Sequence, residues 1–378
     1  MIYLDHAATT RPEAGVLEAM ARCAEKAWAN PSSPYGVAGA ARRELRRARQ
    51  CLAELLNADP GEIVFTSGGT EANNLAATLA AGGHAVISAV EHASVRNAVQ
   101  RRAAEVTLVP TDARGVVDPE AVARAIRPDT KLISVILANN ETGVLQPAAG
   151  IGALARRRRI PFHCDVVQAF GHVPVDMRAL NADLLSLSAH KFYGPRGVGA
   201  LVVRQGTPLR PLLSGGGQEF GLRAGTENVP AVCGMRTAAE LASADLAERA
   251  ARERALLEGF VSQVLSDIPG TRLLCEGAPR LPGLCALRLP GVSSEQAIAD
   301  LDCRGVLVSG GAACASAARE IPYAYRALGL PEAEARCVLR ISIGRHTTAE
   351  EMRTAARALR EVCERRSASA GGPPEDNA

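Results

Sequence analysis

The sequence predicts an α/β protein in which a mostly parallel, helix-covered sheet is joined to a smaller α+β domain. Two observations support this fold class. Short apolar runs alternate with amphipathic stretches from about residue 60 to 205, and this pattern ends after residue 236. Alternation of strand and helix is typical of parallel sheets. The 378 residues, 47% apolar and 22% charged, are enough for two domains with their own cores.

Seven apolar runs in the first part are predicted strands: 62–66, 85–88, 106–109, 132–138, 161–165, 184–188 and 198–203. Four amphipathic stretches between them are predicted helices: 71–80, 94–103, 119–125 and 148–158. A long helix is expected before them, over residues 35–57, because apolar residues recur there at helical spacing. In such sheets ligands bind at the carboxyl ends of the strands, so polar residues in those places are candidates for a site.

The second part begins with a predicted long helix at about 237–265, followed by strands at 284–289 and 306–309. Thr348 and Glu351 form a capping-box pattern that opens the last helix. Residues 367–378 are rich in Ser, Gly and Pro, which predicts a disordered tail. We expect a large domain over 14–250 and a small domain over 1–13 and 251–366.

The composition argues against several classes of protein. No apolar run approaches the ~20 residues of a membrane span, and the N-terminus lacks the basic and apolar regions of a signal peptide. The ten cysteines are scattered without a CxxC pair, which favours neither a disulfide framework nor a zinc site. The net charge of +3 is too small to indicate nucleic-acid binding. We therefore expect a cytoplasmic protein without metal, membrane or nucleic-acid partners.

Lysine is rare in this chain, and this narrows the search for a reactive amine. Only Lys26, Lys131 and Lys191 are present. Arginine cannot replace lysine in a Schiff base because its guanidinium stays protonated. Lys26 and Lys131 lie in contexts typical of the surface, whereas Lys191 follows an apolar run together with Ser188 and His190. Lys191 is thus the candidate for covalent chemistry, with Ser188 and His190 as candidate phosphate ligands.

Two further polar clusters follow predicted strands. Residues 66–71 run through two glycines into a helix, which suits a phosphate cradle at the helix N-terminus and equally suits a plain turn. Asp165 ends a buried strand, where a carboxylate needs a partner. That partner is either a cationic pyridinium nitrogen or the backbone of the next turn.

Three more positions remain open between a chemical and a structural role. His92 suits stacking on a planar ring and proton transfer, or capping of a helix. Asn140 suits a hydrogen bond to a ring oxygen, while its neighbours Glu141 and Gly143 suit structural roles. Cys314 lies among Gly, Ala and Ser, which suits an exposed reactive thiol or a small residue in a tight loop.

Taken in order, these motifs resemble the cysteine desulfurases, a group of fold-type I pyridoxal-phosphate enzymes within the class V aminotransferases. The resemblance covers nearly the whole chain except the tail. The matching stretches are 3–10, 30–33, 67–74, 91–92, 139–143, 163–168, 188–194, 215–219, 223–228, 313–314 and 339–345.

The resemblance implies pyridoxal 5'-phosphate as cofactor and L-cysteine as substrate. It implies that Lys191 forms the Schiff base and moves the Cα proton, that Asp165 pairs with the pyridine nitrogen, and that Cys314 takes the sulfur as a persulfide, leaving alanine. His92 would act with them as a catalytic residue that stacks on the ring. The implied cofactor ligands are Gly69, Thr70, His92, Asn140, Asp165, Gln168, Ser188, His190, Lys191 and Thr226, and the implied substrate ligands are Asn30, Asn140 and Arg340.

The resemblance places Thr226 in the site of a second subunit, which implies a homodimer. The sulfur acceptor, a protein or a small-molecule pathway, is not identified by the sequence. Iron–sulfur cluster assembly, tRNA thiolation, DNA phosphorothioation and a specialised metabolite are all compatible with it. The chain departs from the family pattern at Tyr35 and Ser214, where the family usually has His, and at the alanines flanking Cys314. Two alternatives remain: another pyridoxal-dependent enzyme, such as a selenocysteine lyase or an aminotransferase, and a non-enzymatic pyridoxal-binding protein for sulfur delivery.

Overall fold

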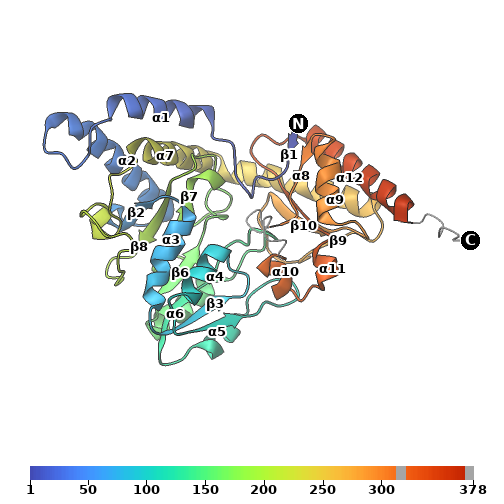
Figure 1. Ribbon diagram of the computed structural model, residues 1–378, viewed down its shortest axis with the longest axis horizontal. Helices are drawn as coiled ribbons and strands as arrows, with labels where there is room; N and C mark the ends of the chain where they lie inside the picture. The colour runs from blue at the N-terminus through green and yellow to red at the C-terminus, as the bar shows by residue number, and fades with distance from the viewer. Residues whose placement is uncertain (312–320, 371–378) are drawn as a thin grey trace, which may run out of the picture.

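The computed structural model describes residues 1–311 and 321–370 of the chain (Figure 1). Its centre is a seven-stranded sheet in the order β2-β8-β7-β6-β5-β3-β4. The strands are β2 (Ile63–Thr66), β3 (His84–Ser88), β4 (Glu105–Val109), β5 (Thr130–Ser134), β6 (Phe162–Asp165), β7 (Leu184–Ser188) and β8 (Gly199–Val203). Only β8 runs against its two neighbours. The predicted α/β class with a mostly parallel sheet is therefore confirmed.

Burial on both faces explains why most residues of these strands are apolar. Every residue of β2, β3, β6, β7 and β8 is buried. Helices from both sides exclude water from the sheet, as is usual for parallel sheets. The helices of this domain are α1 (Ala14–Lys26), α2 (Gly39–Leu56), α3 (Gly69–Ala76), α4 (Ala93–Gln100), α5 (Pro119–Ala125), α6 (Ala148–Arg158) and α7 (Val229–Ala244).

The second part of the chain forms an antiparallel sheet in the order β12-β10-β9. Its strands are β9 (Arg272–Leu273), β10 (Leu284–Arg288) and β12 (Val338–Ser342). Helices α8 (Leu246–Asp267), α9 (Ser294–Asp302) and α12 (Ala349–Ala370) supply a separate apolar core with this sheet. Two short helices, α10 (Tyr323–Ala327) and α11 (Glu332–Ala335), complete this part. The predicted capping box is present, because Glu351 N–H donates to Thr348 Oγ1 over 3.2 Å while the Glu351 carboxylate accepts from Thr348 N–H.

The N-terminus belongs to this second part although it comes first in the sequence. Strand β1 (Ile2–Tyr3) pairs in parallel with β11 (Val306–Leu307). The chain then passes β12, where Ser342 N–H donates to Leu4 O over 2.8 Å and Ser342 Oγ accepts from Ala7 N–H over 2.9 Å. These contacts carry the following residues to the edge of the large sheet. The grouping of residues 1–13 with the small domain stays a prediction, since Thr10 and Glu13 N–H also donate to the carbonyls of His190 and Tyr193 in the large domain.

The long helix predicted at 237–265 is wrong, because the structure has two helices, α7 and α8, that separate at Asp245. The Asp245 carboxylate accepts hydrogen bonds from Arg345 over 2.8 and 3.1 Å and from Arg249 over 3.3 Å. The contacts with Arg345, which comes from a distant segment, offset the loss of helical backbone hydrogen bonds. The expected domain boundary at 250 falls inside α8. The last helix continues to Ala370, so its end overlaps the segment predicted to be a disordered tail.

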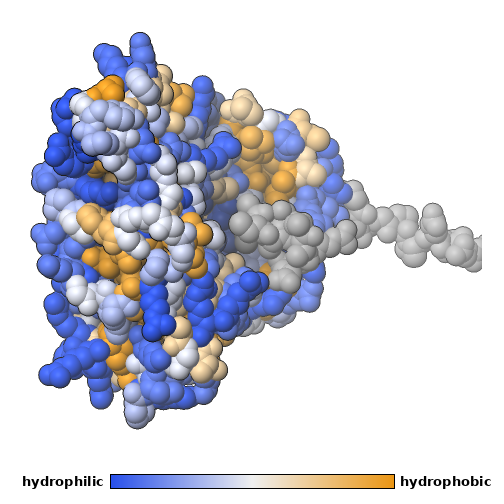
Figure 2. Space-filling view, turned by 60° about the vertical axis from the view of Figure 1, so that its left-hand side comes forward, coloured by the Kyte–Doolittle hydropathy of each residue, from blue (hydrophilic) through white to orange (hydrophobic). Residues whose placement is uncertain are grey.

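The surface is mostly hydrophilic on the larger part of the face shown in Figure 2, with apolar side chains in smaller patches. Across the described ranges, no helix combines the length and the apolar composition that a membrane span needs. Several large apolar side chains stay exposed on the segments around 28–37 and 213–220, including Trp28 (71%) and Phe220 (58%). Both segments lie at the end of the large domain that is remote from the C-terminus (Figure 1).

Candidate active site

A cleft of about 630 Å³ lies at the carboxyl edge of the large sheet, where it meets the second part of the chain. Segments after β2, β3, β5, β6 and β7 all contribute to its walls, as expected for a site at the carboxyl ends of parallel strands. Most of the residues singled out from the sequence line it together: Gly69, Thr70, His92, Asn140, Asp165, Gln168, Ser188, His190, Lys191 and Arg340.

Lys191 presents a primary amine to this cleft. It ends a 3₁₀ turn, Ala189–Lys191, that directly follows β7. Its Nζ donates to Ala8 O over 2.8 Å and also to Ala7 O, and its own carbonyl accepts from His172 Nε2 over 3.0 Å.

The other two lysines lie at the surface. Lys26 is exposed on α1, and Lys131 Nζ donates to Ala81 O. The amine expected to do chemistry is thus the one that the fold brings to the cleft.

Asp165 places a carboxylate at the base of the cleft with only 2% of its surface exposed. Its oxygens accept from Asn73 Nδ2 over 2.8 Å and from Val167 N–H over 2.9 Å. Within the described residues, no basic side chain forms an ion pair with it. A buried carboxylate held by neutral donors is suited to a cationic group of a ligand, because burial of an isolated charge is costly. Gln168 lies beside it and donates from Nε2 to Ala7 O over 2.8 Å.

The turn between β2 and α3 forms a close-fitting cradle at the start of a helix. Gly68 has φ +154°, which side-chain-bearing residues rarely adopt, and a Cβ on Gly69 would lie 2.8 Å from Val167 Cγ2. Glycine therefore lets the start of α3 pack closely against the segment that follows β6 and the end of β7. The N–H groups that open α3 and the hydroxyls of Thr70 and Ser188 suit an anion. His190 is also at this wall, with Nδ1 3.1 Å from Thr9 Oγ1, and burial lowers its pKa to about 4.

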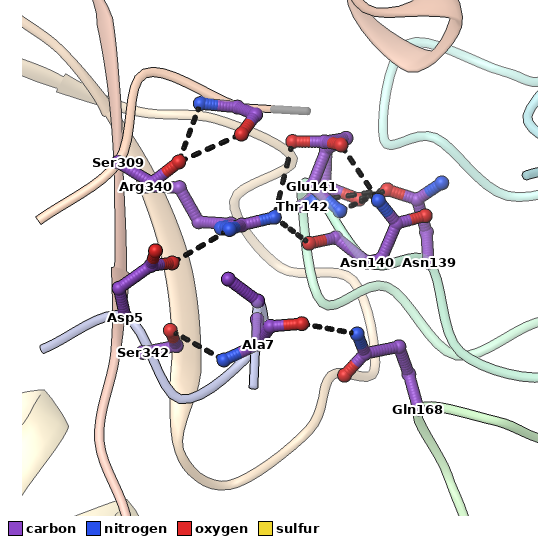
Figure 3. Close-up of polar contacts among 12 residues, drawn as sticks. Asp5, Ala7, Asn139, Asn140, Glu141, Thr142, Gln168, Ser309, Arg340 and Ser342 are labelled. Carbon is purple, nitrogen blue, oxygen red and sulfur yellow. Dashed lines mark hydrogen bonds and ion pairs between the residues drawn. The ribbon is translucent and has the colours of Figure 1, made fainter. Parts of the chain in front are cut away.

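Arg340 is buried at the side of the cleft formed by the second part of the chain (Figure 3). Its Nη2 donates to Asp5 Oδ1 over 2.7 Å, and its Nη1 donates to Asn140 O over 2.9 Å and lies 3.5 Å from Glu141 Oε2. Its Nε is buried without a partner among the described atoms. The guanidinium is thus fixed in place at the wall of the cleft by two carboxylates.

The structure does not bring every predicted residue into the cleft. Asn30 is exposed and its Oδ1 accepts from Ser32 N–H over 2.9 Å, so its substrate-binding role stays a prediction. Thr226 is exposed and does not line the cleft, so its predicted role also stays a prediction. Cys314 lies outside the described residues, although Gly311 and Ile321, which flank the gap, are described and Ile321 lines the cleft.

Several residues of the site carry no role in the sequence interpretation. Asp5 and Ala7 arrive from the N-terminal segment, Asn73 from α3, and Arg196 and Tyr323 from the cleft walls. The N-terminal stretch matches the family motif, but its contribution is made partly by backbone carbonyls, which have no signature in side-chain type. Asn73 lies within a matching motif, and its direct hydrogen bond to Asp165 becomes visible only when α3 is packed on the sheet.

Glu91 allows a test of the electrostatics of this cleft. Burial raises its pKa to about 8, although its Oε1 accepts from Ser88 Oγ and from Ile136 N–H. The Glu91 carboxyl therefore stays protonated in the folded protein up to a pH of about 8, whereas in the unfolded chain it loses its proton at the ordinary carboxyl pKa. The free energy of unfolding falls as the pH rises between these two pKa values. The side chain of Glu91→Gln stays neutral at every pH. As the pH is raised from 5 to 8, the free energy of unfolding of this variant should therefore increase by roughly 3–4 kcal/mol relative to that of the parent.

Urea unfolding of both proteins at several pH values measures this difference. Glu350→Gln is the matched control, because Glu350 lies on the surface of α12 beside Arg353. Its unfolding curve should follow that of the parent at every pH. If Glu91→Gln also ran parallel to the parent, the buried carboxyl would not be protonated in the folded state.

No group of three or more His, Cys, Asp or Glu side chains suited to a metal is found in the described part of the chain. The chemical content of the cleft is instead an amine, a buried carboxylate, an anion cradle and a fixed arginine. This set fits a planar ligand with a phosphate at one end, a basic ring nitrogen at the other and an aldehyde that can react with an amine.

Comparison with known proteins agrees with this description. The profile of the family described as Aminotransferase class-V matches residues 2–354. A curated relative, cysteine desulfurase IscS of Dictyoglomus turgidum, is 39% identical over 373 residues, covering 96% of this chain and 95% of that protein. The solved NifS-like protein of Rickettsia africae superposes with a TM-score of 0.89 at 31% identity, covering 96% and 99% of the two chains. A solved structure of SspA in complex with cysteine superposes with a TM-score of 0.80 at 35% identity, covering 92% and 100%.

Proposed function

The chain belongs to the class-V aminotransferase family, and we propose that it acts as a cysteine desulfurase that converts L-cysteine to L-alanine and passes the sulfur to an acceptor. The observation that carries this proposal is the single cleft that joins Lys191, Asp165 and the Gly68–Gly69 cradle. The full-length similarity to cysteine desulfurases and to the cysteine-bound SspA supports L-cysteine as the substrate.

The residues of the cleft fit pyridoxal 5'-phosphate. The α3 N-terminus with Gly69, Thr70, Ser188 and His190 would hold the phosphate, and Asp165 would hold the protonated ring nitrogen. When bound, this cofactor supplies an aldehyde for a covalent link to an amine and a ring that accepts electrons. Gln168 and Asn140 would contact the polar edge of the ring, with His92 over its face.

Lys191 would carry the cofactor and then move the Cα proton of the substrate. Its amine is held by the carbonyls of Ala7 and Ala8, which keep it at the wall of the cleft. Arg340 would orient the substrate carboxylate through its donors, since the guanidinium is already fixed by Asp5 and Glu141. Asn30 completes the substrate ligands proposed from the family resemblance.

Cys314 would act as the nucleophile toward the substrate sulfur. Its thiolate forms a bond to that sulfur while the carbon–sulfur bond of the substrate breaks, which leaves a persulfide on the enzyme and, after protonation, alanine. We propose that the persulfide then passes to a sulfur acceptor, with iron–sulfur cluster assembly among the candidate pathways. The cytoplasmic location expected from the sequence stays a prediction.

We also propose a homodimer in which Thr226 of one subunit completes the phosphate site of the other. Two features support this arrangement. Thr226 is exposed and outside the cleft of its own subunit. The exposed Trp28, Tyr35 and Phe220 lie on segments at one end of the large domain, where association would remove them from water.

Product analysis tests the proposed function. Purified protein supplied with pyridoxal phosphate, L-cysteine and a thiol reductant should form alanine and sulfide in equal amounts. Cys314→Ala should lower alanine formation at least tenfold while the cofactor remains bound, because the sulfur then has no acceptor on the enzyme.

Other products would contradict the proposal. Pyruvate and ammonia would indicate a different lyase, and a keto acid formed with amino transfer would indicate an aminotransferase. Full turnover of cysteine in Cys314→Ala would favour a selenocysteine lyase or another lyase. A protein that binds the cofactor but turns over none of these substrates would favour a non-enzymatic role.

A further inference from the structure

A chain of hydrogen bonds runs from the buried carboxylate of Asp165 to the imidazole of His92. Asn73, on α3, donates from Nδ2 to Asp165 Oδ2 over 2.8 Å and to Ser94 Oγ over 2.8 Å. Ser94, at the start of α4, lies with its Oγ 2.7 Å from His92 Nδ1. The backbone N–H of Ser94 also donates to His92 Nδ1, over 3.1 Å. Three segments that are distant in sequence are thus connected at the base of the cleft.

The direction of each hydrogen bond in this chain follows from its first member. The Asn73 atom that faces Asp165 must be the nitrogen, because an amide oxygen at 2.8 Å from a carboxylate oxygen would be repelled. The second hydrogen of that nitrogen is directed to Ser94 Oγ, which therefore accepts. The Ser94 hydroxyl hydrogen is then left for His92 Nδ1.

His92 Nδ1 consequently receives two donors, the hydroxyl and the backbone N–H of Ser94. A nitrogen that accepts hydrogen bonds carries no proton, so the proton of the neutral ring lies on Nε2. The surroundings also favour the neutral ring, since burial lowers the pKa of His92 and the charge of Lys191 adds to this, whereas Asp165 opposes it. Across the described ranges, no hydrogen bond involves Nε2, and His92 lines the cleft.

We infer that Asn73 and Ser94 are positioning residues that hold His92 as the neutral Nε2–H tautomer, so that its ring acts in the cleft as a hydrogen-bond donor and not as a base. This inference rests on the proposed function only for the identity of the ligand that His92 meets. It implies that the base for the substrate protons is a different group, and Lys191 is the amine in position. His92 would then supply a hydrogen bond from Nε2–H during turnover, while its own proton stays on the ring.

Nitrogen NMR of the full chain with bound pyridoxal phosphate tests the inference. The chain has seven histidines, so ¹⁵N-histidine labelling gives few signals, and the His92 signals are identified by their loss in His92→Gln. We expect the Nδ1 resonance in the range of an unprotonated nitrogen and the Nε2 resonance in that of a protonated nitrogen at neutral pH. Ser94→Ala should make His92 titrate at a higher pH and populate the other tautomer in part, because one donor to Nδ1 is lost.

Matched variants separate this role from a general effect on structure. Ser94→Thr keeps the hydroxyl and should restore the parent spectrum. Asn74→Ala changes the next residue of α3, which donates to Thr70 O, and should leave the His92 signals unchanged. A protonated Nδ1 in the parent protein at neutral pH would overturn the inference, as would a Ser94→Ala spectrum and titration identical to those of the parent.

The readout is independent of turnover. If the protein shows the expected His92 tautomer but forms no alanine from cysteine, the proposed function is wrong and the inference about His92 is still supported. If the protein is an active desulfurase but His92 Nδ1 is protonated, only the inference is wrong.

Discussion

Replacing Lys191 by alanine is expected to lower alanine formation from L-cysteine by at least about 10⁴-fold, the scale on which enzymes lose activity when a residue of the covalent machinery is removed. The variant should also lose the covalent link to the cofactor. Borohydride reduction followed by peptide mapping should find the pyridoxyl group on Lys191 in the parent and on no residue of the variant.

The expected effect is large because, among the residues that the structure describes, no other lysine lines the cleft. Lys191 Nζ is held at the cleft wall by Ala7 and Ala8. Lys131 binds the carbonyl of Ala81 at the surface, and Lys26 is exposed on α1. Lys131→Ala is therefore a matched control and should keep activity within about twofold, as is usual for substitutions at the surface. A pyridoxyl group on another residue of the parent would contradict the prediction and the mechanism that depends on it.

The second large effect is expected for Asp165→Asn, which should lower activity about 10³-fold, comparable to the removal of a major electrostatic contact in other active sites. The substitution keeps the shape of the side chain and removes its charge. With 2% of its surface exposed, Asp165 has little water to compensate for that loss. The ring nitrogen would then lose the partner that keeps it protonated. Turnover and the absorbance of the bound cofactor, recorded across pH, measure the effect.

Asp183→Asn is the matched control for this variant. Asp183 also belongs to the large sheet region, where its carboxylate accepts from Phe162 N–H over 2.9 Å and lies 3.3 Å from Arg204 Nε. It does not line the cleft, so its neutral variant should keep activity within about threefold. If Asp165→Asn behaved like Asp183→Asn, the carboxylate would have a structural role and the proposed pairing with the ring would be wrong.

The strands of the large sheet were predictable from the sequence because burial on both faces leaves continuous apolar runs. For example, the run predicted at 184–188 is β7, and Lys191 and His190 follow it as expected. The convergence of the polar residues at the strand ends was predictable for a second reason, because parallel strands bring their carboxyl ends to one edge of the sheet. The site residues that come from separate strands therefore converge as predicted.

Contacts between distant segments were not predictable in this way. The break at Asp245 is stabilised by Arg345, one hundred residues later, which the local sequence does not reveal. The local signal for a helix start is the Asp245-x-x-Glu248 spacing, which the prediction of one continuous helix did not use. The roles of Asp5 and Ala7 depend on β12, which holds the N-terminal segment against the second part of the chain. Asn73 is an ordinary helical residue in sequence, and its hydrogen bonds to Asp165 and Ser94 require α3, α4 and β6 to be assembled.

The position of the N-terminal segment has a consequence for the order of folding. Strand β1 pairs with β11, and Ala7 N–H donates to Ser342 Oγ across 335 positions of the chain. Contacts of such long sequence separation form late and slowly in folding. The two carbonyls that hold the amine of Lys191 lie on this segment. We therefore expect this part of the cleft to be completed late in folding, after the sheet of the large domain has formed.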